Sequence, residues 1–169
     1  MPVPGLLREC YELLASGLSA DGSLSADGSI SLSYDQRCKS RSRINAGDFE
    51  LAWFLPRGIV LRHGQVLLCT DGYRIRVEAA QEEVTQVNCN DAVLLTRIAY
   101  HLGNRHVSLQ IGDSWIRYQN DAVLDDMVKG LGGHPLNISM PFHPEAGAYH
   151  SHHQPHEHAS STEHSSHYE

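Results

Sequence analysis

Hydrophobic and polar positions alternate in short runs over the first 80 residues, as they do in β-strands. The alternating apolar residues are Ile30, Leu32 and Tyr34, then Phe49, Leu51 and Trp53, then Val66 and Leu68, then Tyr73, Ile75 and Val77. Asp71-Gly72 separates the last two runs and is typical of a two-residue hairpin turn. The pattern predicts several short strands in a small sandwich or barrel.

The pattern at the beginning of the chain is ambiguous. A helix is favoured by an apolar stripe formed by Leu6, Leu7, Cys10, Leu13 and Leu14, but the segment is short. A tandem Leu-Ser-Ala-Asp-Gly-Ser follows at 18–23 and 24–29. It is polar and contains glycine, and we predict a loop there.

Two segments after residue 81 change to helical spacing. Their apolar faces are formed by Leu94, Leu95, Ile98, Ala99 and Leu102 and by Leu124, Met127, Val128 and Leu131. Each has a candidate N-cap and a terminating glycine, which are Asn90 or Asp91 with Gly103, and Asn120 or Asp121 with Gly132.

Predicted strands surround these helices. Their ranges are 84–89, 107–111, 115–119 and 136–142. The order β-α-β-β-α-β is a ferredoxin-like pattern, in which both helices cover one face of an antiparallel sheet. The expected fold class is therefore α+β, with an all-β domain over 1–80, a ferredoxin-like domain over 81–143 and a histidine-rich tail over 144–169.

The tail has no apolar period after Tyr149, so we predict that it is disordered without a ligand. Neutral imidazole binds nickel, copper and zinc. The candidate metal ligands of the tail are His150, His152, His153, His156 and His158. A solvated low-complexity tail is the alternative, and the tail alone does not select among the three metals.

Composition excludes several classes of function. A net charge of -7 argues against general nucleic-acid binding. No apolar run approaches the ~20 residues that span a bilayer, and no secretion signal begins the chain, so we expect a cytoplasmic protein.

The four cysteines are widely spaced and predicted to be free thiols. No nucleophile–base pair or phosphate loop appears, so we expect no enzymatic activity.

Residues 100–106 read Tyr-His-Leu-Gly-Asn-Arg-His, where the first helix ends and the next strand begins. Gly103 and Asn104 tolerate the left-handed conformation that a helix stop needs. His106 is then expected to open a strand at the rim of the domain. Spacing alone favours a structural role for such a histidine over a ligand role.

Several segments resemble the UreE family of urease accessory proteins. They are 99–111, 121–132 and 141–149 leading into the histidine-rich end, and, in the N-terminal half, 34–41, 55–58 and 61–64. The resemblance covers the chain from about residue 30 onward. The combination of the 100–106 motif with the histidine tail is specific.

The resemblance implies a nickel metallochaperone, a homodimer joined through its C-terminal domains, and a β-domain similar to a peptide-binding module. It places His106 of both subunits at the two-fold axis, where His150 and His152 are the first choice to complete the Ni(II) shell. Zn(II) and Cu(II) stay open as alternative metals. The implied partners are the urease apoprotein and an accessory GTPase.

Two other functions stay open at this point. A nickel or zinc storage protein would use the tail equally well, and a peptide-binding co-chaperone would depend on the β-domain instead of His106. Where some relatives carry extra histidines, this chain has Gln119, Asn120 and Ala122.

Three further features stay open as well. His63, in a turn, is favoured as an exposed polar residue over a ligand. Cys89 is a buried thiol or a soft auxiliary ligand. The basic cluster of Arg37, Lys39, Arg41 and Arg43 is a solvated strand edge or a docking surface for an acidic partner.

Overall fold

The structure is a computed structural model that describes residues 5–14 and 25–146 of the chain. The predicted tail ligands His150, His152, His153, His156 and His158 lie outside the described residues. The first copy of the tandem repeat, 18–23, does as well, so the loop predicted there stays a prediction. Within the described ranges, no helix is long and apolar enough to cross a membrane.

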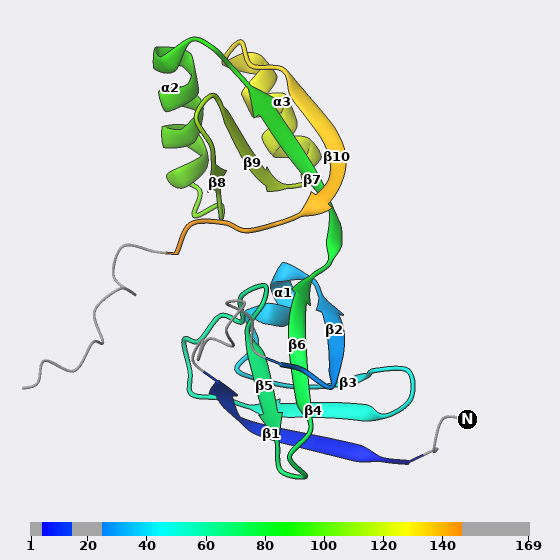
Figure 1. Cartoon of the computed structure of the whole chain (residues 1–169). Helices are drawn as coiled ribbons and strands as arrows, with labels where there is room; N and C mark the ends of the chain where they lie inside the picture. The colour runs from blue at the N-terminus through cyan, green and yellow to red at the C-terminus, as the bar shows by residue number, and fades with distance from the viewer. Residues whose placement is uncertain (1–4, 15–24, 147–169) are drawn as a thin grey trace, which may run out of the picture.

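The N-terminal half forms one six-stranded sheet in the order β2-β6-β5-β1-β4-β3 (Figure 1). Its strands are β1 (Leu7–Leu14), β2 (Gly28–Leu32), β3 (Arg41–Asn45), β4 (Glu50–Phe54), β5 (Val66–Cys69) and β6 (Arg74–Ala79). β1 runs parallel to β4 and antiparallel to β5. The beginning of the chain is therefore a strand and not a helix, because pairing on both edges satisfies its backbone groups.

A short helix, α1 (Tyr34–Arg37), interrupts this half, so it is not entirely β as we expected. Ser33 caps it: its hydroxyl accepts from the Gln36 backbone N–H, while the Gln36 side chain accepts from the Ser33 N–H. This reciprocal capping box satisfies two donors at the helix start. The predicted strand at 30–34 consequently ends at Leu32.

The strands of the N-terminal sheet enclose a hydrophobic core. Its buried members include Cys10, Leu32, Leu51, Trp53, Leu61, Leu67, Ile75 and Val77. The Trp53 indole N–H donates to the Lys39 carbonyl at 2.7 Å, so the largest core side chain also satisfies its polar atom.

The C-terminal half follows the predicted order β-α-β-β-α-β. Its elements are β7 (Gln81–Asn88), α2 (Ala92–Gly103), β8 (Gln110–Ile111), β9 (Trp115–Gln119), α3 (Ala122–Gly130) and β10 (Pro135–Pro141). The sheet order is β10-β7-β9-β8 and every neighbouring pair is antiparallel (Figure 1). Of the alternative caps, Asp91 starts α2 and Asp121 starts α3.

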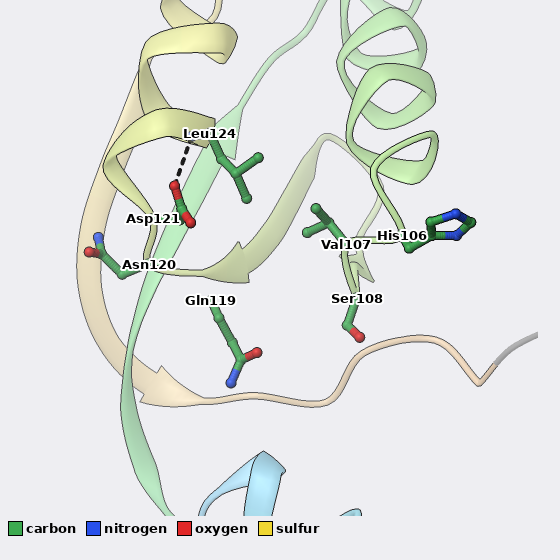
Figure 2. Close-up of a pocket in the computed structure, with 7 residues that line it drawn as sticks. All are labelled: His106, Val107, Ser108, Gln119, Asn120, Asp121 and Leu124. Carbon is green, nitrogen blue, oxygen red and sulfur yellow. Dashed lines mark hydrogen bonds between the residues drawn. The ribbon is translucent and has the colours of Figure 1, made fainter.

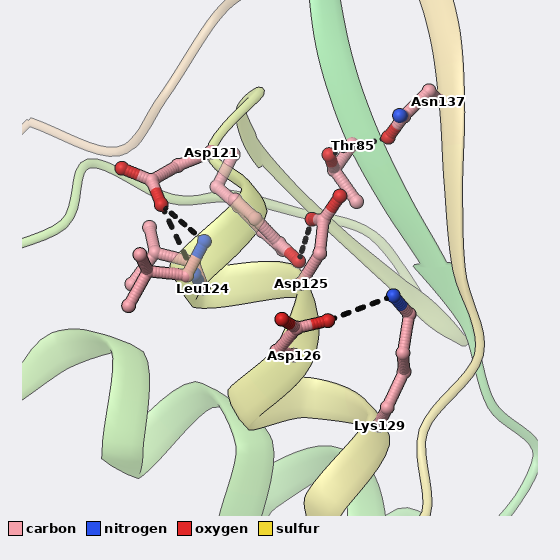
Figure 3. Close-up of polar contacts among 9 residues, drawn as sticks. Thr85, Asp121, Leu124, Asp125, Asp126, Lys129 and Asn137 are labelled. Carbon is pink, nitrogen blue, oxygen red and sulfur yellow. Dashed lines mark hydrogen bonds and ion pairs between the residues drawn. The ribbon is translucent and has the colours of Figure 1, made fainter.

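Both helices pack into one core with β7 and β9. The buried members are Val87, Ile98, Leu102, Ile116, Tyr118 and Val128. A polar pair lies within this core, because the fully buried Tyr118 donates its hydroxyl to Asp125 Oδ1 at 2.8 Å. Figure 3 shows Asp125 on α3, next to the Asp121 cap and the exposed Asp126–Lys129 ion pair.

Side chains from α1 join the two halves. Arg37 donates hydrogen bonds to the carbonyls of Phe142 and Leu61. The Tyr34 ring packs edge-on against Phe142 at 5.3 Å, and the Tyr34 N–H donates to Glu82 Oε1 at 2.6 Å. Placing Arg37 in a surface basic cluster was wrong, because its side chain is buried in this junction. Lys39, Arg41 and Arg43 are exposed, and β3 is an edge strand.

Candidate functional site

A tight turn carries His106 at the end of α2. The Arg105 N–H donates to the Leu102 carbonyl at 3.0 Å, and the His106 N–H donates to the Gly103 carbonyl at 2.9 Å. The Val107 N–H returns to the same Leu102 carbonyl at 3.3 Å. The turn is thus tied to the last turn of a well-packed helix.

The backbone of His106 is left-handed, with φ of 57°. It is the sole residue other than glycine with positive φ in the described part of the chain. We expected Gly103 or Asn104 to adopt this conformation, but Gly103 is helical and Asn104 is right-handed at φ -63°. The expectation that His106 opens a strand was also wrong, since β8 is limited to Gln110–Ile111. A non-glycine residue in this region is unusual and is often found at functional positions.

The His106 side chain is exposed and projects away from the fold. Figure 2 shows its ring pointing away from the other residues that line a cavity of about 370 Å³. The remaining lining residues are Val107, Ser108, Gln119, Asn120, Asp121 and Leu124. The imidazole is therefore presented outward instead of being enclosed by its own chain.

The polar residues of the cavity wall already have structural partners. Asp121 Oδ1 accepts from the backbone N–H groups of Val123 and Leu124 at 2.8 and 3.1 Å. Asn120 donates to Thr85 Oγ1 at 3.1 Å, and Gln119 donates to Asp35 of α1 at 3.3 Å. The wall is thus part of the fold, and it adds no second imidazole to His106.

Exposed apolar side chains lie on the helix that leads to His106. Val93 is 70% exposed and Tyr100 is 64% exposed. They are seven residues apart on α2, which places them on one face of the helix. Ile111, at the end of β8, is 54% exposed. The exposed apolar face of α2, formed by Val93 and Tyr100, is typical of a contact surface.

The described residues do not bring three or more His, Cys, Asp or Glu side chains together around a shared point. His106 therefore belongs to no preformed cluster of three or more such ligands in the described part of its own chain. The tail histidines proposed as its neighbours lie beyond residue 146, outside the described residues.

Cys89 is partly buried, and its thiol donates to the Asp91 carbonyl at 3.3 Å, which is a structural contact at the start of α2. The four cysteines are free thiols, as predicted. Burial raises the pKa values of Cys10 and Cys69, so neither of these thiols ionises readily. None of the four cysteines lies in a cluster of three or more candidate metal ligands among the described residues.

His63 and His143 lie beside each other although 80 positions separate their numbers. Their ring centroids are 6.1 Å apart and the rings are nearly perpendicular. His63 Nδ1 accepts from the Ala79 N–H at 3.2 Å. Burial, Arg37, His63 and Arg117 lower the pKa of His143. Sequence reasoning missed this pairing, because periodicity does not show which loop of one half faces the other.

Arg117 holds the segment that leads to His143. Its guanidinium donates to the Gln86 side chain at 2.7 Å and to the Pro141 carbonyl at 3.4 Å. Gln110 Oε1 accepts from the His143 backbone N–H at 3.0 Å. Sequence reasoning gave Arg117 no role, because a buried arginine in an alternating strand has no periodic signature.

Comparisons with known proteins match both halves of the chain to one family. The family model described as "UreE urease accessory protein, C-terminal domain" matches residues 82–167, and the one for the N-terminal domain matches residues 18–80. The chain is similar to the urease accessory protein UreE of Teredinibacter turnerae, at 55% identity over 70% of this chain and 78% of the relative.

Two further relatives carry the same name. The protein of Alcanivorax borkumensis is 48% identical over 71% of this chain and 72% of its own length. The protein of Pseudomonas putida is 47% identical over 86% of this chain and 88% of its own length. The relatives are named as accessory proteins of an enzyme, which agrees with the expected non-enzymatic role. The chain belongs to the UreE family of urease accessory proteins.

Proposed function

We propose that this chain is a metallochaperone that delivers Ni(II) for assembly of the urease active site in the cytoplasm. The outward-pointing imidazole of His106 carries the proposal. It is held on a tight turn at the end of a packed helix, and its ring points away from its own chain. A ligand presented in this way is accessible to a second subunit and to an acceptor protein.

Two chains share the ion in this proposal. Val93 and Tyr100 give α2, the helix that ends at the His106 turn, an exposed apolar face. Packing this face against a second copy buries the apolar area, and a two-fold axis turns one His106 into two ligands. The C-terminal domain, 81–143, is then the dimerisation domain. Its sheet order β10-β7-β9-β8 supports a ferredoxin-like assignment.

The tail supplies the remaining ligands. His150 and His152 come first after the described residues, and His153, His156 and His158 follow. Two imidazoles alone leave coordination positions open on Ni(II), and tethered tail histidines have a high effective concentration there. Zn(II) and Cu(II) suit the same imidazole set, so the urease context favours nickel.

The partners follow from the accessory role. The relatives are named for urease, so we propose the urease apoprotein and its accessory GTPase as the acceptor complex. A solvent-exposed, two-chain site suits transfer, because an acceptor replaces ligands one at a time. The N-terminal domain, 1–80, presents the edge strand β3 with exposed Arg41 and Arg43 as a docking surface for an acidic segment of that complex.

The test is urease activation at limiting nickel, with His106→Asn as the decisive variant. Asparagine tolerates left-handed φ, so it keeps the turn and removes the imidazole. We expect activation to fall strongly in His106→Asn and to persist in His134→Asn, which removes another exposed histidine. Full activation by His106→Asn would refute the proposal and favour a co-chaperone that acts through the β-domain.

A storage protein is distinguished by the tail. A chain that ends at Tyr149 keeps the His106 pair and much of the transfer in our proposal. A store loses nearly all of its metal capacity and its effect on urease in the same truncation.

A further inference from the structure

We propose that His63 and His143 form a second metal site, which binds one divalent nickel, zinc or copper ion between the two halves of the same chain. The site is separate from His106 and does not depend on dimerisation. His63 comes from the loop between β4 and β5 of the N-terminal half. His143 follows β10 of the C-terminal half.

The separation of the two rings suits one shared ion. A nitrogen–metal bond of 2.0–2.1 Å puts the ion roughly 3 Å from each ring centroid, so two rings on one ion have centroids about 4.5 to 6.4 Å apart. The observed separation is 6.1 Å. Both side chains are exposed at the surface of the junction, so an ion reaches them from solvent and water fills its other coordination positions.

Hydrogen bonds hold both ligand backbones in place. The Gly64 N–H donates to the Val77 carbonyl at 2.8 Å, which fixes the loop that carries His63. On the other side, the His143 N–H donates to Gln110 Oε1 at 3.0 Å, and Arg37 anchors the preceding carbonyl. Two ligands on anchored segments lose little backbone freedom when they bind an ion.

Metal binding breaks one hydrogen bond of His63 and replaces it with a bond to the ion. A neutral imidazole has a single lone pair, and His63 Nδ1 now uses it to accept the Ala79 N–H at 3.2 Å. The exposed ring rotates to give this nitrogen to the ion, and the Ala79 N–H turns to water. Arg37 and Arg117 lie near His143 and oppose a cation, so the site is weaker than one with a carboxylate ligand.

The Ala79 amide gives the site its own spectroscopic signature. Zn²⁺ is diamagnetic, so the amide spectrum is readable while the ion is added. We expect the Ala79 N–H resonance to shift as Zn²⁺ binds, because its acceptor is lost. A tail site or the His106 site gives no reason for Ala79 to respond.

The experiment uses the full-length chain with His106 and the seven tail histidines from His150 to His167 replaced by Asn. Calorimetric and NMR titrations with Zn²⁺ then see only the histidines at 63, 101, 134 and 143. We expect one ion per chain, and about 100-fold weaker binding after either His63→Gln or His143→Gln, because each removes half of a chelate. His134→Gln is the matched control and keeps the affinity.

Metal-free amide spectra and thermal unfolding show whether each Gln variant is folded, and His63→Asn and His143→Asn replace any variant that is not. Unchanged Zn²⁺ affinity in folded variants of both histidines, or an Ala79 resonance that does not move, overturns the proposal. All arms lack His106, so this result is independent of whether the His106 pair delivers nickel.

Discussion

Arg37 of α1 donates a hydrogen bond to the backbone carbonyl of Phe142, 105 residues further along the chain. Phe142 is fully buried, and its ring contacts Tyr34 from the same short helix as Arg37. This contact ties the N-terminal sheet to the end of β10, where the histidine-rich segment begins. Burial lowers the pKa of Arg37, as expected for a cation removed from water.

Arg37→Met should destabilise the chain by about 2 kcal/mol, because it leaves the buried carbonyls of Phe142 and Leu61 without their donor. Urea unfolding measures this. Arg43→Met is the control, since it breaks an exposed ion pair with Glu50 and should cost about 0.5 kcal/mol or less. Equal losses in the two variants would show that the Arg37 contact contributes no more than a surface pair.

Tyr118→Phe should cost about 1–2 kcal/mol, because it removes the hydroxyl that donates to the buried Asp125 carboxylate. Tyr100→Phe removes a hydroxyl from a residue that is 64% exposed and should be neutral. Chemical denaturation of both variants is the measurement. A neutral Tyr118→Phe would mean that water replaces the hydroxyl beside Asp125.

Asp121→Ala should cost about 1 kcal/mol, since its carboxylate accepts from two N–H groups at the start of α3. Asp126→Ala changes an exposed carboxylate on the same helix and should cost less than about 0.5 kcal/mol. The free energies of unfolding are compared. Because Asp121 lines the cavity beside His106, we also expect its loss to leave metal affinity unchanged if its role is to cap α3.

The pKa of His143 is lowered in the folded chain, first by partial desolvation of its ring and then by the nearby Arg37, His63 and Arg117. An unfolded histidine titrates near 6.5, so below that pH the unfolded chain takes up a proton that the folded chain resists. The stability associated with neutral His143 is therefore present above about pH 6.5 and is lost as the pH falls through the folded pKa.

In metal-free protein, His143→Gln should lose less thermal stability between pH 7 and pH 5.5 than the natural chain. His134→Gln should follow the natural chain. Melting temperatures at the two pH values decide this, and parallel losses in all three proteins would contradict the lowered pKa of His143.

The C-terminal half was the more predictable part of the fold. Its helices have strong apolar stripes, and Asp91 and Asp121 are N-caps whose side chains act locally. The element order was therefore visible in the sequence. The strand predicted at 107–111 was too long, because only Gln110–Ile111 pairs in the sheet. The alternating run did not show that the turn at His106 keeps residues 107–109 out of the strand ladder.

The N-terminal half was less predictable because long-range pairing decides it. The apolar residues of Leu7–Leu14 have a helical spacing, and only the position of the segment between β4 and β5 selects the strand. α1 was missed because a helix of four residues is too short to show a helical period. Its capping box was the only local signal for it. Arg37 was assigned to the surface because it was grouped with the nearby basic residues Lys39, Arg41 and Arg43.

The candidate site also has a part that the sequence predicted and a part that only the three-dimensional arrangement shows. The motif and the family resemblance identified His106, but not its left-handed backbone or the outward direction of its ring. The His63–His143 pair depends on how the two halves meet, which no residue pattern within either half encodes.

In our proposal, one nickel ion is shared by His106 of two chains. Ni²⁺ titration calorimetry with the molecular mass measured by ultracentrifugation tests this most directly. We predict a dimer whose tightest class holds one ion per two chains, and the loss of that class in a dimeric His106→Asn variant. A tight class of one ion per chain, or one unchanged by His106→Asn, would contradict the account.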